Sequence, residues 1–179
     1  MRKPPAKKKP LDLEGLLAYA GRVLSARAQT AGELRRKLAT KAEKPEDVDE
    51  AIRRMKDAGY LDDQRFAEAF AHWRRDNEGY GKDRVTRDLL ARRISPAIAK
   101  KAAEKAFAAA DEMEMIRRFL GRKYRGKDLP ALFQEEKHMA SAYRRLRTAG
   151  FSSANSIKAI KEYGNGGEVL DALESLENQ

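Results

Sequence analysis

The sequence predicts an all-α fold built from three tandem three-helix repeats that form an elongated, curved array. Valine, isoleucine and threonine together number only fourteen, while alanine, leucine, arginine, lysine and glutamate dominate, a composition that favours helices over strands. Apolar residues also recur at helical spacing through most of the chain. This pattern returns, with Leu38, Leu89 and Leu146 in equivalent places about fifty residues apart once an insertion is allowed for. Each unit is too small to be stable alone, so we expect the repeats to stack.

The first repeat is expected over residues 11–59. Within it, Thr30-Ala-Gly-Glu33 is a capping box, in which the threonine side chain accepts from the N–H three residues on and the glutamate reaches back. Pro45 suits the first position of a third helix. Gly59 suits the end of that helix, because glycine adopts the left-handed conformation at little cost.

The second repeat is expected over residues 60–109. Phe66, Phe70 and Trp73 recur at spacings of four and three, which places the three rings on one face of a helix. We expect this face to be buried. The glycines of Gly79-Tyr80-Gly81 then break the chain before a basic helix whose inward side carries valine and leucine.

The third repeat is expected over residues 110–163, with an insertion at about 129–136. Residues 1–10 are rich in proline and lysine and are predicted to be a disordered basic tail. Residues 164–179 form an acidic extension, in which a short helix is expected from about Val169 to Leu176.

The formal net charge of +10 is unevenly distributed. Residues 1–10 carry five basic side chains and no acid, and Arg117 to Lys127 carries six and no acid, whereas residues 164–179 carry four acids and no base. A basic body of this kind suits a polyanionic partner, most simply nucleic acid.

No motif predicts an enzyme, a metal site or a bound cofactor. The chain has no cysteine and only two histidines, His72 and His138, neither with a second ligand at metal spacing. The acidic pair Asp62 and Asp63 and the cluster from Asp111 fall at helix starts, where capping explains them. No apolar run reaches the length of a membrane span, and the N-terminus lacks the apolar segment of a secretory signal, which predicts a cytoplasmic protein.

Arginines recur in register on the middle helix of each repeat, which predicts a continuous charged strip on the surface of the protein. Such a strip could lie along the phosphates of a nucleic acid or along the acidic surface of a protein polymer. Trp73 and Tyr80 are candidates for stacking on bases, although we expect Trp73 to lie in the core. The predicted partner-contacting or DNA-contacting residues are Arg35, Arg36, Arg84, Arg87, Arg92, Arg144, Arg145 and Arg147.

Three stretches carry a resemblance to a known family. GYLDDQRFAEAF, then GYGKDRVTRDLLARRIS, then YRRLRTAGFSSANSIKAI resemble the successive signatures of the RecX family, regulatory proteins of the RecA recombinase, and TAGELRRKL resembles its opening signature. The resemblance covers about residues 13–163. It implies three three-helix repeats, no catalytic activity, binding in the groove of the RecA filament on DNA, and often DNA binding as well.

The chain departs from the family pattern at one turn. The family often has glycine before the isoleucine that ends the middle helix of the second repeat, whereas this chain has Arg93. We expect a monomer that modulates, most simply inhibits, RecA and binds single- or double-stranded DNA weakly and without sequence selectivity. The alternatives are a stand-alone DNA-binding protein of helix-turn-helix type and a helical scaffold for another protein.

Overall fold

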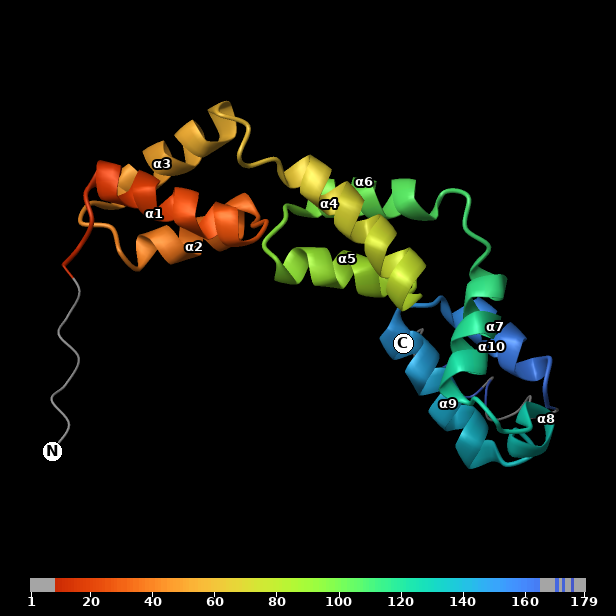
Figure 1. Cartoon of the computed structure of the whole chain (residues 1–179). Helices are drawn as coiled ribbons and strands as arrows, with labels where there is room; N and C mark the ends of the chain where they lie inside the picture. The colour runs from red at the N-terminus through yellow and green to blue at the C-terminus, as the bar shows by residue number, and fades with distance from the viewer. Residues whose placement is uncertain (1–8, 165–169, 171, 173–174, 176–179) are drawn as a thin grey trace, which may run out of the picture. The chain divides into compact units, whose positions relative to one another are not determined.

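The computed structural model describes residues 9–164 together with residues 170, 172 and 175. Within residues 9–164 it contains ten α-helices and one π-helical turn, and no strand beyond an isolated parallel bridge between Leu11 and Ala42. The predicted all-α fold class is confirmed, and the helices fit three-helix repeats (Figure 1). Most of the predicted basic tail and of the acidic extension lies outside the described residues.

The described chain forms two compact units. The first takes in the described residues up to Ala67 together with Leu90–Ile98, and the second takes in Glu68–Leu89 together with the described residues from Ala99 onward. Helices expected in the second repeat therefore contribute to both units. The limits of the three repeats stay a prediction from the sequence.

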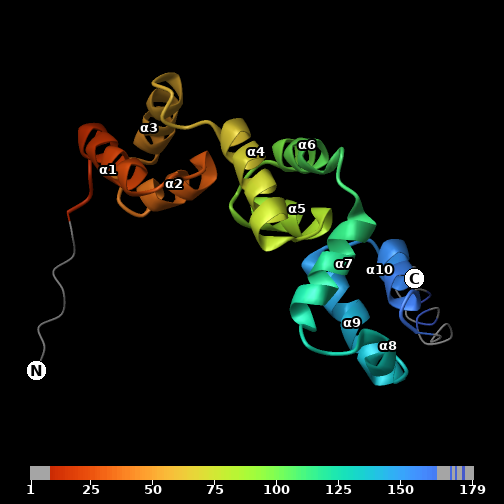
Figure 2. The same cartoon turned by 45° about the vertical axis from the view of Figure 1, so that its right-hand side comes forward.

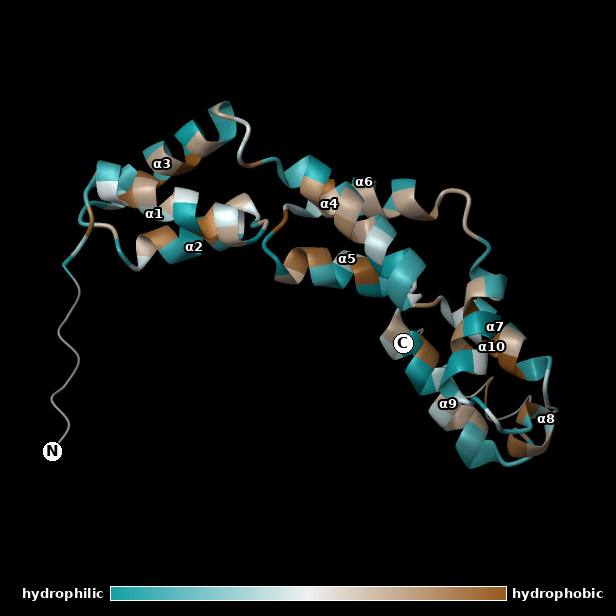
Figure 3. Ribbon diagram, viewed as in Figure 1, coloured by the Kyte–Doolittle hydropathy of each residue, from teal (hydrophilic) through white to brown (hydrophobic). Residues whose placement is uncertain are grey.

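Three helices form the main bundle of the first unit, α1 (Leu13–Ala26), α2 (Ala31–Ala39) and α3 (Pro45–Asp57), and they pack on one another pairwise (Figure 2). The predicted capping box is confirmed, since Glu33 N–H donates to Thr30 Oγ1 at 3.0 Å and Thr30 N–H donates to Glu33 Oε2 at 3.2 Å. Apolar positions lie on the inward sides of these helices (Figure 3). The buried core contains Leu16, Ala20, Leu34, Leu38, Val48, Ala51, Ile52 and Leu61.

The helices of the expected second repeat are α4 (Asp63–Trp73), α5 (Lys82–Ala91) and α6 (Pro96–Phe107). A π-helical turn, η1 (Arg74–Glu78), follows α4 and leads into the predicted break at Gly79-Tyr80-Gly81. Gly79 ends this turn in the left-handed conformation, with φ 65°.

The expected third repeat contains α7 (Glu112–Lys123), α9 (Glu136–Ala149) and α10 (Ser153–Lys161), with α10 packed on both of the others. The insertion forms α8 (Leu129–Leu132) and adds Phe133, whose side chain is fully buried. The Phe133 ring meets Tyr124 and Tyr163 edge-on, with ring centroids 5.8 and 6.2 Å apart. The insertion is therefore part of the hydrophobic core of this unit.

The aromatic face predicted for α4 is wrong at Trp73. Its side chain is 52% exposed, and Phe66 and Phe70 are only half-buried. The buried positions are Ala67 and Ala71, which lie beside the aromatic row and are fully buried. The apolar periodicity therefore identified the correct side of the helix. The two alanines occupy the centre of the buried face, however, and the aromatic rings lie at its edge.

Two acidic residues cap a neighbouring helix rather than their own. Asp62 accepts from Arg65 N–H in its own helix at 2.9 Å, as predicted. Asp63 instead accepts from Ala31 N–H at the start of α2, at 2.8 Å. Glu112 likewise accepts from the N–H of Ser152, ahead of α10, at 2.7 Å. These carboxylates stabilise helix N-termini, as predicted, but they also tie helices together.

A joint between middle helices occurs once in each unit. In the first unit, the Thr30 hydroxyl donates to the carbonyl of Arg92 at 2.6 Å. In the second unit, Gly81 N–H donates to the carbonyl of Ala149 at 2.9 Å. Thr30 and Gly81 occupy the same place relative to Leu38 and Leu89, and Arg92 and Ala149 occupy the same place relative to Leu89 and Leu146. Each joint therefore places the N-terminus of one middle helix against the C-terminal end of the next.

The joints require close approach of the backbone. A Cβ atom on Gly32 would lie 2.7 Å from the carbonyl oxygen of Arg93, and one on Gly81 would collide with the carbonyl of Gly150. Gly150 adopts the left-handed conformation with φ 91°, and Arg93, at the equivalent place, adopts it with φ 64°. Although the chain has arginine where the family often has glycine, the turn at Arg93 keeps the same left-handed backbone conformation. Arg93 therefore adopts a conformation that favours glycine.

Replacing Arg93 with glycine is expected to raise the free energy of unfolding by about 1 kcal/mol, because an L-residue in the left-handed conformation carries a cost of that order. Chemical denaturation of the full chain measures the change. An unchanged or lower free energy of unfolding for Arg93→Gly would contradict the assigned strain.

Replacing Gly32 with alanine is expected to lower the free energy of unfolding by about 1–3 kcal/mol, because the added methyl group overpacks the first joint. Gly21→Ala is the matched control, since a Cβ there meets nothing within 4 Å. Alanine in that helix interior is expected to stabilise the chain by about 0.5–1 kcal/mol. Equal effects of the two substitutions would argue against the joint.

Candidate polyanion-binding groove

A basic hollow of about 430 Å³ lies in the second unit, beside the joint. Helices α5, α7 and α9 contribute four cationic side chains to its lining and no acidic one. The lining residues are Tyr80, Arg84, Phe119, Lys123, Ser141, Arg144, Arg145, Thr148 and Ala149. Cationic side chains gathered in a concave surface raise the local concentration of anions. We call this hollow the basic groove.

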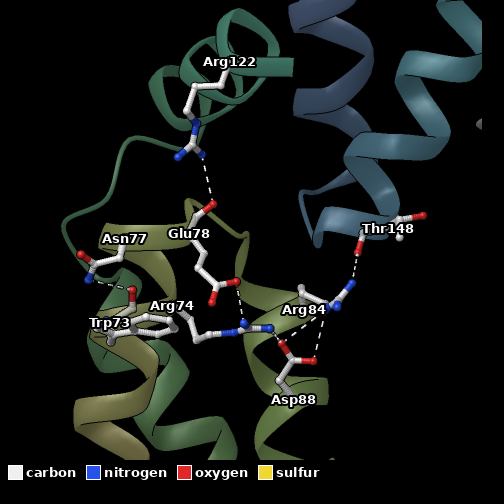
Figure 4. Close-up of polar contacts among 8 residues, drawn as sticks. All are labelled: Trp73, Arg74, Asn77, Glu78, Arg84, Asp88, Arg122 and Thr148. Carbon is white, nitrogen blue, oxygen red and sulfur yellow. Dashed lines mark hydrogen bonds and ion pairs between the residues drawn. The ribbon is translucent and has the colours of Figure 1, made fainter. Parts of the chain in front are cut away.

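Arg84 lies at the edge of the basic groove where α5 meets the end of α9 (Figure 4). Its Nε pairs with Asp88 at 3.2 Å, and one terminal nitrogen donates to the carbonyl of Thr148 at 3.4 Å. Arg87 donates to the same carbonyl at 3.2 Å. Both arginines therefore help to close the joint, and Arg84 also lines the groove.

Three cations of the basic groove have no carboxylate partner among the described residues. Arg144 and Arg145 are exposed on α9 and make no ion pair there, and Lys123 lies only over the Phe119 ring, with its Nζ 5.9 Å from the centroid. By contrast, Arg117 and Arg118 on the same α7 pair with Glu162 and Glu114. The basic groove thus gathers three cations that no carboxylate of the described residues neutralises.

The Tyr80 ring is covered by guanidinium groups. Arg74 lies 4.6 Å from its centroid and Arg84 lies 5.1 Å from it. Such cation–π contacts stabilise the two arginines and occupy the ring. Tyr80 therefore packs as part of the wall, and the groove presents charge rather than a platform for bases.

A second tyrosine, Tyr124, interacts electrostatically with Arg145 of the groove. Burial raises the pKa of the Tyr124 hydroxyl above its ordinary value, and the positive charge of Arg145 partly offsets this rise. The offset is what an uncompensated guanidinium near a phenol does, because it favours the ionised form.

The remaining predicted arginines fall into two groups. In the first unit, Arg35 pairs with Asp49, Arg36 is exposed, and Arg92 pairs with Glu33 at 3.3 Å. In the second unit, Arg147 is 29% exposed and donates to the carbonyl of Phe151 at the end of α9. The structure thus brings Arg84, Arg144 and Arg145 together in one groove, and it gives Arg147 a partner at a helix end.

Sequence reasoning missed Lys123 and Thr148 as parts of this groove, and it offered Tyr80 only as a candidate for stacking on bases. The signal for Lys123 was the basic run from Arg117 to Lys127, which gave no indication of which members face α9. Among the described residues, no group of three or more side chains could hold a metal ion. None of the helices in that part of the chain has the length and apolar character needed to cross a bilayer.

The fold and the groove define a class, an all-α protein of tandem three-helix units with a basic surface groove. A family description, "RecX, second three-helix domain", matches residues 62–102. The chain is 34% identical to the regulatory protein RecX of Deinococcus radiodurans over 149 residues, which cover 83% of this chain and 68% of the relative. The chain belongs to the RecX family, as the sequence resemblance predicted.

Further relatives agree with this assignment. The regulatory protein RecX of Trichlorobacter lovleyi is 30% identical over 132 residues, which cover 74% of this chain and 84% of the relative. The crystal structure of RecX from Lactobacillus salivarius superposes with a TM-score of 0.64 over 84% of this chain and 96% of that one, at 18% identity. At that identity the likeness supports the fold alone.

Removing Arg144 and Arg145 together is expected to weaken binding of a labelled oligodeoxythymidine and to make it less sensitive to salt. Each lost phosphate contact reduces the slope of log affinity against log salt by about 0.7 for a single strand, so the slope should fall by about 1.4. Fluorescence anisotropy over a salt series measures it.

The matched control is Arg53→Ala/Arg54→Ala, which removes an adjacent arginine pair on α3 that is already bonded to Glu50. Both double variants lower the net charge of the chain by the same amount. An equal loss of slope in both double variants would show that overall charge, and not the basic groove, governs binding.

Proposed function

We propose that this chain is a non-enzymatic regulator of the RecA recombinase that binds the RecA filament on DNA and inhibits its ATP hydrolysis, strand exchange and coprotease action. The observation that carries the proposal is the set of three uncompensated cations in the basic groove of a RecX-family chain. A nucleoprotein filament presents phosphates and acidic side chains in a repeating array, which is the kind of partner that such a groove fits.

The proposed mechanism is a shift in the state of the filament. A bound protein changes such an equilibrium only by its difference in affinity for the two states. Within each unit, a joint holds the N-terminus of one middle helix against the C-terminal end of the next. A monomer with contact residues on more than one repeat would engage neighbouring filament subunits and favour the filament state that it binds better.

The proposed contact with DNA is weak and unselective. The basic groove offers guanidinium and ammonium groups, which bind phosphates. The ring of Tyr80 is already covered by the guanidinium groups of Arg74 and Arg84, so it offers no free face to a base. Phosphate contacts position a protein on nucleic acid and carry no sequence information. This argues for the filament regulator over a stand-alone reader of DNA sequence.

The test is the single-strand-dependent ATP hydrolysis of RecA with increasing amounts of the chain. We expect the wild-type chain to lower the rate at substoichiometric ratios and to hydrolyse no ATP itself. Arg144→Ala/Arg145→Ala is expected to need about tenfold more protein for the same inhibition, which corresponds to about 1.4 kcal/mol of binding free energy.

Arg53→Ala/Arg54→Ala serves again as the charge-matched control and is expected to inhibit like the wild type. Circular dichroism confirms that each variant is helical. No change in RecA hydrolysis at equimolar wild-type chain would contradict the proposed function, and selective binding to one duplex sequence would favour a helix-turn-helix type of DNA-binding protein.

A further inference from the structure

We propose that Asp88 is an internal counter-ion of the basic groove, which competes with a bound polyanion for Arg84 and so limits the affinity of the groove for phosphates. This inference rests on the groove being a polyanion site, as in the proposed function. It adds a residue that sets the strength of binding without itself touching the partner.

Asp88 is held at the edge of the groove by two guanidinium groups. Arg84 Nε lies 3.2 and 3.3 Å from its two carboxylate oxygens, and Arg74 pairs with the same carboxylate from the other side (Figure 4). The Asp88 side chain is 22% exposed. Its ion pairs are thus shielded from water more than those of a typical surface pair, which strengthens them.

Arg74 keeps this carboxylate in place. It also pairs with Glu78 at 2.6 Å, is only 15% exposed, and lies over the rings of Phe70 and Tyr80. Burial disfavours its charge, but the hydrogen bonds that Arg74 donates to Asp88 and Glu78 outweigh the effect of burial and raise the pKa of Arg74. With Arg74 fixed, Asp88 cannot turn away from Arg84 without leaving a half-buried guanidinium short of a partner.

The resulting network has no net charge, because it contains two guanidiniums, Arg74 and Arg84, and two carboxylates, Glu78 and Asp88. Arg84 therefore lines the groove while its charge is already neutralised. A phosphate that approaches Arg84 must share it with Asp88 or displace that carboxylate. Among the cations that line the groove, those without a carboxylate partner in the described residues are Lys123, Arg144 and Arg145.

The direct test is Asp88→Asn, which keeps the shape and a hydrogen-bond acceptor but removes the charge. Affinity for a labelled oligodeoxythymidine is measured by anisotropy over a salt series. We expect Asp88→Asn to bind severalfold more tightly than the wild type at low salt, with a slope steeper by about 0.7, as one additional phosphate contact implies. The ratio of the affinity of Asp88→Asn to that of the wild type should then fall about fivefold for each tenfold rise in salt concentration.

Glu114→Gln is the matched control, because Glu114 is a carboxylate of the same unit that pairs with Arg118 outside the basic groove. It changes the net charge equally and is expected to leave the slope unchanged. Equal slopes for the two variants, or weaker binding by Asp88→Asn while its helicity is intact, would overturn the assignment.

Arg84→Ala keeps the inference testable if Asp88→Asn does not fold. In the wild-type background its effect on the salt slope should be less than half that of Arg144→Ala, because the charge of Arg84 is already neutralised. An effect equal to that of Arg144→Ala would overturn the inference. Absence of oligonucleotide binding by the wild type, with inhibition of RecA retained, would also overturn it and would leave the proposed function standing.

Discussion

In both units, a hydrogen bond between the start of one middle helix and the carbonyl end of the next joins helices that lie far apart in the sequence. At the second joint two backbone N–H groups, those of Gly81 and Asp83, donate to the carbonyls of Ala149 and Gly150. Unpaired N–H groups of one helix thus satisfy unpaired carbonyls of another, and the two helix dipoles align favourably. A Cβ atom at position 81 would collide with the carbonyl of Gly150, so the joint requires glycine at this position.

The same joint explains why arginines that look alike in the sequence differ in role. Those closest to it are used for structure: Arg84 is neutralised by Asp88, and Arg147 donates to a carbonyl at the end of α9. Arg144 and Arg145, on the outer side of α9, pair with no carboxylate in the described part of the chain. A cluster of such charges repels itself, so its presence in a concave surface is best explained by an anionic partner.

Much of the fold could be predicted from the sequence, because helix ends are local. The capping box at Thr30, the proline at Pro45 and the glycine at Gly59 each act within one turn, and the structure confirms all three. Contacts that join distant segments could not be predicted. Asp63 had a sufficient local explanation, yet it caps α2. Trp73 has the right spacing for a core position, yet alanines occupy the centre of that face. The groove likewise needs Lys123 and Arg144 from separate helices.

In the proposed function, the basic groove contacts the RecA filament. Hydrogen–deuterium exchange of the chain, measured with and without RecA filaments on single-stranded DNA, tests this contact. We expect slower exchange in the segments that line the groove, at the end of α7 and along Ser141–Ala149 of α9, when filaments are present. Unchanged exchange in those segments, with protection confined to helices remote from the groove, would contradict it.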